Sequence, residues 1–216
     1  AQREIKYNVS QESFAYGTPK NISEKLVNSA DSIYLTDPII QYKVGTTVKY
    51  TDRTDIDQWD ADAYTVTYTP RYGGTDTKEE SSLILTPVSV NFTISQAQIN
   101  ANGLVGGASV EYDPAGRSFT VKGTRVSLGG LGKYSKLEDI ISGTVSGTRS
   151  DFTALNFSLG TADHTVALKN ADTYTVTLAL KDTKNFVWTG GGSNPTATWT
   201  IMKAKVDQVT KPTDDL

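Results

Sequence analysis

The stretch Asp172-Thr-Tyr-Thr-Val-Thr-Leu-Ala-Leu180 has a second copy upstream, Asp62-Ala-Tyr-Thr-Val-Thr-Tyr68. In both copies apolar or aromatic residues alternate with threonine, which is the period of a strand with one buried face. Neither copy carries a reactive group. The repeat therefore predicts a scaffold of two similar units, each with this strand near its centre.

Other segments repeat in the same order with nearly constant spacing, as expected for a two-unit array. The matched pairs are Phe14–Tyr16 with Val110–Tyr112, Ile39–Gly45 with Ala154–Gly160, and Val88–Ala97 with Ala197–Ala204. Two segments that share a Lys-Leu pair, Ser23–Val27 and Ser135–Ile141, are candidates for short helices. We expect a first domain over residues 1–98, a second over 99–205, and a polar tail or linker over 206–216.

Composition favours an exported β-sheet protein. The 216 residues include 11 tyrosines and many threonines and valines, which are strand-forming residues. Cysteine is absent, which excludes disulfides and thiolate zinc sites and favours secretion from a Gram-positive bacterium. The formal net charge of −3 is spread along the chain, so no basic surface for nucleic acid is expected. No apolar run approaches the roughly 18 residues of a membrane span, so no membrane insertion is expected.

Many short strands separated by turns indicate antiparallel sheets that pack face to face. We therefore predict an all-β protein of two tandem immunoglobulin-like antiparallel β-sandwiches, with a short helix possible in each. The aromatic residues of the repeated strands are expected to fill the cores.

Three motifs of the second half resemble a known family. They are Asn170-Ala-Asp-Thr-Tyr-Thr-Val-Thr-Leu178, Lys184-Asn-Phe-Val-Trp188-Thr-Gly and Ala197-Thr-Trp-Thr-Ile-Met-Lys-Ala204. This pattern resembles the MBG-type bacterial Ig-like repeats of Gram-positive cell-surface proteins. The first half keeps the Tyr-Thr-Val-Thr motif and has Phe92 where the family has tryptophan, so it resembles a divergent copy.

The resemblance implies a non-catalytic spacer in a secreted or wall-attached surface protein, such as an adhesin stalk or an S-layer-like protein. Its partners would be neighbouring repeats of the same polypeptide. The alternative is an adhesin module that recognises a glycan or a host protein.

No catalytic constellation is found, so no enzyme is predicted. The single histidine, His164, has no accompanying nucleophile motif and is expected in a solvated turn. The glycine-rich segment Leu128-Gly-Gly-Leu-Gly-Lys133-Tyr134 lacks the first glycine and the final Ser or Thr of a phosphate-binding loop. A flexible hairpin or loop is expected there instead.

An acidic segment ahead of Tyr64 distinguishes the first unit, because it is longer than its counterpart in the second. Its five carboxylates, Asp52, Asp55, Asp57, Asp60 and Asp62, are of the residue type that calcium prefers, although they lack the spacing of an EF-hand loop. A solvated loop that Arg53 partly neutralises is the simpler interpretation. In the recognition alternative, Trp59 is an exposed anchor with Asp57 and Asp60 beside it. No cofactor other than this possible calcium ion is expected.

Overall fold

A computed structural model describes residues 2–205, and the predicted tail over 206–216 lies outside them. The chain divides into two compact units. The first unit comprises Ala1–Gln98 together with two segments from later in the chain, Leu128–Ser135 and Asp182–Val187. The second unit comprises Ile99–Ser127, Lys136–Lys181 and the segment from Trp188 onward. The sequence did not predict the two later segments of the first unit.

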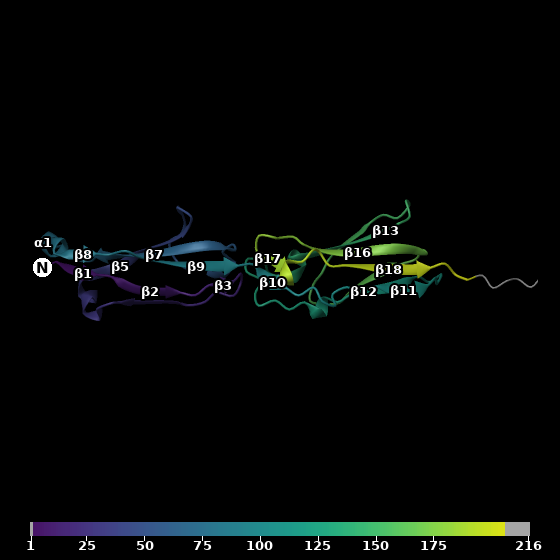
Figure 1. Cartoon of the computed structure of the whole chain (residues 1–216), viewed down its shortest axis with the longest axis horizontal. Helices are drawn as coiled ribbons and strands as arrows, with labels where there is room; N and C mark the ends of the chain where they lie inside the picture. The colour runs from purple at the N-terminus through teal and green to yellow at the C-terminus, as the bar shows by residue number, and fades with distance from the viewer. Residues whose placement is uncertain (1, 206–216) are drawn as a thin grey trace, which may run out of the picture. The chain divides into compact units, whose positions relative to one another are not determined.

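The main sheet of the first unit has five strands in the order β3-β9-β7-β5-β6 (Figure 1). Two smaller sheets accompany it, β2 with β4 and β1 with β8. The elements in chain order are β1 (Arg3–Ile5), β2 (Tyr7–Gln11), β3 (Phe14–Ala15), β4 (Ile22–Leu26), the 3-10 helix η1 (Ser29–Tyr34), β5 (Leu35–Val44), β6 (Thr47–Tyr50), η2 (Ile56–Gln58), β7 (Asp62–Tyr72), α1 (Thr77–Ser81), β8 (Leu83–Leu85) and β9 (Val88–Ser95).

The second unit repeats this plan with a five-stranded sheet in the order β11-β18-β16-β13-β14 and a two-stranded sheet of β12 with β15. Two short strands, β10 (Ala97–Ile99) and β17 (Phe186–Trp188), pair with each other, and each has two of its three residues in the first unit. The other elements are β11 (Ala108–Glu111), β12 (Arg117–Val121), η3 (Gly123–Arg125), η4 (Leu137–Asp139), β13 (Ile141–Gly147), β14 (Leu155–Ser158), β15 (His164–Leu168), β16 (Asp172–Leu180), η5 (Thr189–Gly191) and β18 (Thr196–Met202).

The repeated stretch forms the central strand of each five-stranded sheet, as β7 and β16. Tyr64 on β7 lies opposite Phe92 on β9, and Tyr174 on β16 lies opposite Trp199 on β18. All four side chains are buried. The predicted match between Phe92 and Trp199 is therefore confirmed, and the prediction of all-β sandwiches is confirmed as well.

The two central tyrosines also make the same polar contact. The hydroxyl of Tyr64 donates to the carbonyl of Asp60 at 2.9 Å, and that of Tyr174 donates to the carbonyl of Asn170 at 2.8 Å. Each tyrosine thus ties its strand to the turn four residues upstream, which satisfies a buried hydroxyl and holds the strand end in place.

A parallel pair of strands forms one side of each main sheet. In the first unit Phe14 of β3 lies opposite Ile94 of β9, and in the second Val110 of β11 lies opposite Ile201 of β18. One further backbone hydrogen bond extends each parallel pair in the same way. Tyr16 N–H donates to the Ser95 carbonyl at 2.8 Å, and Tyr112 N–H donates to the Met202 carbonyl at 2.9 Å. The predicted match of Phe14–Tyr16 with Val110–Tyr112 is confirmed.

The smaller sheets differ between the units. Strand β4 precedes β5 as β12 precedes β13, so β4 and β12 hold equivalent places. β4 pairs antiparallel with β2, which comes before it in the chain. β12 instead pairs antiparallel with β15, which comes after it.

Several expectations about secondary structure are wrong. Residues 22–26 form strand β4, because pairing with β2 outweighs a weak helical pattern. The second helix candidate contains only one 3-10 turn, η4, before β13 begins. Ile39–Gly45 lies mostly on β5 next to the central strand, whereas the segment matched to it forms the edge strand β14.

Among the described residues, no helix is both long and apolar enough to cross a membrane.

The hydroxyl bond of Tyr174 yields a stability prediction. Tyr174→Phe should lower the free energy of unfolding by about 1 kcal/mol, because the Asn170 carbonyl loses its donor while the ring packing stays. Denaturant unfolding followed by tryptophan fluorescence measures this loss. Tyr112→Phe is the control, since Tyr112 is 38% exposed, and it should change the midpoint little. Equal effects of the two variants would contradict the role given to the Tyr174 hydroxyl.

Candidate functional site

Trp59 lies in the core of the first unit. Its side chain is only 3% exposed, and its ring stacks on Tyr50 with centroids 3.9 Å apart. Tyr42 meets the same indole edge to face at 4.9 Å. The indole N–H donates to the Thr54 carbonyl at 3.3 Å. The expectation of an exposed Trp59 is therefore wrong, because three tyrosines of the sheet, Tyr64 among them, pack around the ring.

The five acidic side chains of the preceding loop are not gathered together. Among the described residues, no group of three or more His, Asp or Glu side chains is placed to hold a metal ion. Asp52 accepts from the Thr54 backbone at 2.8 Å, while Asp55 and Asp57 lie outside the core. Arg53 donates to the Gln11 side chain and to the Lys20 carbonyl, and among the described residues it forms no ion pair with these carboxylates. A calcium site here stays a prediction.

Asp60 and Asp62 take part in a different arrangement, in which the buried Asn185 is the central group. The Asn185 side chain is fully buried; its carbonyl accepts from Ala61 N–H at 2.7 Å. Its amide donates to Asp60 and to Asp182, each at 2.8 Å. The Asn185 backbone carbonyl accepts from Ala97 N–H at 2.8 Å. The segment 182–187 is thereby bonded to the loop before β7 and to the end of the first 98 residues.

Lysines complete this arrangement around the two carboxylates. Lys133 lies 3.3 Å from Asp60 and 3.5 Å from Asp182, and Lys184 lies 3.1 Å from Asp62. These contacts engage Asp60 Oδ1 and Asp62 Oδ2, so both carboxylates take part in the packing of the first unit.

The glycine-rich segment of residues 128–133 packs against the turn after β3. A Cβ on Gly130 would lie 2.0 Å from the Gly17 carbonyl oxygen, so only glycine allows the two backbones to approach this closely. Gly132 has φ +57° and lies against the Tyr16 ring, and the neighbouring Lys133 N–H donates to the Tyr16 hydroxyl at 2.9 Å. These glycines therefore have a packing role. Sequence reasoning missed it, because the contact joins positions more than 100 residues apart.

Hydrogen bonds lower the pKa of two carboxyl groups around Asn185. Burial by itself would raise the pKa of Asp182, but donors from Asn185 and Tyr134 hold that pKa below its usual value. The bond from Lys184 likewise lowers the pKa of Asp62. Burial and the bond to Asp182 raise the pKa of Tyr134 to about 12. Both carboxyl groups are therefore charged at neutral pH.

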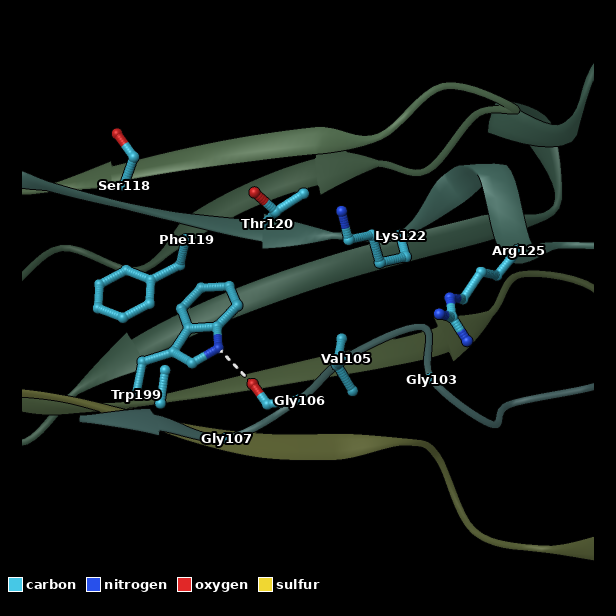
Figure 2. A pocket seen from close by; sticks show the side chains of 11 residues that line it. Gly103, Val105, Gly106, Gly107, Ser118, Phe119, Thr120, Lys122, Arg125 and Trp199 are labelled. Carbon is cyan, nitrogen blue, oxygen red and sulfur yellow. Dashed lines mark hydrogen bonds between the residues drawn. The ribbon is translucent and has the colours of Figure 1, made fainter. Parts of the chain in front are cut away.

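A separate groove opens in the second unit between β12 and the segment 103–107 (Figure 2). Its volume is about 430 Å³. The floor consists of the Phe119 ring and the Trp199 indole, which stack with centroids 4.9 Å apart and are nearly covered. The Trp199 N–H donates to the Gly106 carbonyl at 2.9 Å, as Figure 2 shows. Lys122 and Arg125 line one end of the groove, and no acidic residue lines it.

A second hollow of about 380 Å³ lies in the same unit, near the start of β16. Arg149 and Asp172 line it. Asp172 is already engaged, because it accepts from the backbone N–H groups of Thr148, Arg149 and Thr173. Arg149 forms an ion pair with Asp151. The main charged pair of this hollow is therefore already engaged, and the larger first groove is the better candidate site.

Comparisons with known proteins add little to this geometry. No family model matches the chain, and no curated protein matches it. A solved structure of fibronectin(III)-like modules of Clostridium thermocellum CbhA matches 94% of this chain and 96% of its own length. The identity is 10% and the TM-score is 0.29, so no role is transferred from that protein. The resemblance to MBG-type repeats stays a prediction.

Asn185 yields a second stability prediction. Asn185→Ala should destabilise the first unit by about 2–4 kcal/mol, because it removes three side-chain bonds and leaves the buried Ala61 N–H without an acceptor. Denaturant unfolding with amide exchange at β7 and β9 as a local readout measures the loss. The matched control is Asn8→Ala, since Asn8 is exposed on β2 of the same unit. An unchanged midpoint for Asn185→Ala would contradict this role.

The lowered pKa of Asp182 predicts acid sensitivity. A carboxyl group with a lowered pKa binds its proton more weakly in the folded state, so its stabilisation is present above pH of about 4 and is lost as the pH falls through the folded-state pKa. Unfolding midpoints should therefore fall between pH 5 and 2. Asp182→Asn should flatten this dependence, whereas Asp37→Asn, an exposed control, should leave its slope unchanged. Parallel slopes for all three proteins would refute the assignment.

Proposed function

We propose that this chain is a non-catalytic structural spacer of a secreted or wall-attached bacterial surface protein, such as an adhesin stalk or an S-layer-like protein. The observation that carries this proposal is the parallel pairing at one side of each main sheet, β3 with β9 and β11 with β18. In each pair the early strand of the unit lies beside its last strand.

This pairing suits a segment under tension. When two strands are parallel, the start of the first and the end of the second lie at opposite ends of the pair. A force that pulls the chain apart then loads all of their hydrogen bonds together instead of one after another. In the second unit four residues of β11 are in register with β18, and the Tyr112 bond extends the ladder. A spacer needs this kind of resistance.

An extracellular location is supported by composition. The chain has no cysteine and is rich in threonine and tyrosine, and its second half resembles surface repeats of Gram-positive bacteria. Neighbouring repeats of the same polypeptide would be its main partners. Recognition of a glycan or host protein through Trp59 is not favoured, because the indole is buried beneath Tyr50.

Single-molecule pulling tests the spacer role. The chain, placed between marker domains, should give distinct force peaks. Val110→Pro should lower the peak of the second unit strongly, because Val110 N–H points to the same side as Tyr112 N–H and hence toward β18.

The matched control is Ser109→Pro. Its N–H points away from β18, since backbone groups of neighbouring residues in a strand face opposite sides. This variant should keep most of the unfolding force. If the chain extends without force peaks, or if the two proline variants behave alike, the proposal fails.

A further inference from the structure

Strand β12 has one unpaired edge. Its pairing with β15 occupies one side, and the structure shows no strand on the other side among the described residues. In the first unit the equivalent strand β4 has β2 on that side over five residues. The second unit thus lacks a strand at a position that the first unit fills with its own chain.

The chain approaches this position and then leaves it. Lys122 N–H donates to the Leu104 carbonyl at 2.7 Å, so the chain starts beside β12. Two residues later the chain has crossed to the five-stranded sheet, where the Gly106 carbonyl accepts from the Trp199 N–H. Strand β11 of that sheet then begins at Ala108. The groove of Figure 2 is the space left between β12 and this crossing segment.

The backbone of β12 presents free hydrogen-bonding groups to the groove. In a strand, alternate residues direct both N–H and C=O to the same side. Since Lys122 N–H points toward Leu104, the N–H and C=O groups of Thr120 and Ser118 point the same way. Both residues line the groove, and within residues 2–205 no partner is found for these four groups. An unpaired edge of this kind is a template for another strand.

The groove also specifies the character of an added strand. Phe119 and Trp199 at the floor favour a side chain that is apolar and branched. The charge at one end is positive, from Lys122 and Arg125. Asp163 already pairs with Lys122 at 3.0 Å, which leaves Arg125 as the main contact for an added anion.

We propose that this groove binds an extended segment of another polypeptide, which adds to β12 as an antiparallel strand and places an acidic side chain beside Lys122 and Arg125. The antiparallel direction follows the pairing of β2 with β4. Because β12 runs toward Lys122, the acidic residue belongs at the N-terminal end of the added segment. Backbone hydrogen bonds then supply the affinity, and the charge selects the register.

A synthetic peptide, acetyl-Asp-Val-Thr-Val-Thr-Val-amide, tests the proposal with the full chain. Residues opposite Ser118 and Thr120 lie on the outward face that Lys122 shares, so Asp is placed opposite Thr120, a threonine opposite Ser118, and a valine opposite Phe119. In an NMR titration the amides of Ser118 and Thr120 should shift, and their hydrogen exchange should slow. Shifts confined to other strands would overturn the proposal.

Backbone methylation distinguishes strand pairing from other contacts. Methyl groups on the threonine nitrogens remove the donors that face β12 and should weaken binding by about tenfold or more. Methyl groups on the valine nitrogens, which face away, are the matched control and should have a much smaller effect. Equal loss for both peptides, or no binding of the parent peptide, would refute strand addition.

The charge contact is tested separately. Arg125→Ala should weaken binding of the parent peptide about two- to fivefold, whereas Lys136→Ala, an exposed lysine that does not line the groove, should leave it unchanged. Sodium acetate should not displace the peptide beyond the effect of ionic strength. Displacement at low acetate concentration would show a simple anion site and would overturn the proposal.

Discussion

The register between the central strand and the last strand of each sheet determines the rest of the fold. Because side chains alternate between faces, a shift of one residue would turn every buried aromatic side chain outward. The opposed pairs Tyr64 with Phe92 and Tyr174 with Trp199 make such a shift costly, since each would expose two large rings. The same register aligns the parallel early strand and places Trp199 on the floor of the groove.

The sequence predicts a strand correctly where the residue pattern within that strand is clear. Alternation and matching motifs mark the repeated strand, its aromatic partner and the matching early segment directly, so the sequence predicts them. It predicts antiparallel sheets only, and the parallel pairing of the early segment is not among its predictions. Strand β4 was mistaken for a helix, since its side chains are mostly exposed and show no alternation. Ile39–Gly45 was matched to the wrong strand, because apolar residues and a glycine recur in both places.

The candidate site was harder to predict, because its components come from distant positions. An acidic loop with a tryptophan reads as a binding surface when only neighbouring residues are considered. The partners of that loop, Asn185 and Lys133, lie far along the chain, and Trp59 is covered by tyrosines from separate strands. The groove of the second unit has no sequence motif at all. It arises from the point at which the chain changes sheets, which only the backbone reveals.

The first unit is assembled from three separate segments of the chain, and this affects the order in which the protein can fold. The chain passes from one unit to the other after residues 98, 127, 135, 181 and 187. During synthesis or export the N-terminal residues emerge first, yet they wait for Asp182–Val187 before Asn185 can satisfy the Ala61 amide. The N-terminal unit is therefore completed only after residue 187, when most of the second unit has already been made. Until then the first unit lacks the bonds of Asn185, so the completion of its folding depends on synthesis of most of the second unit.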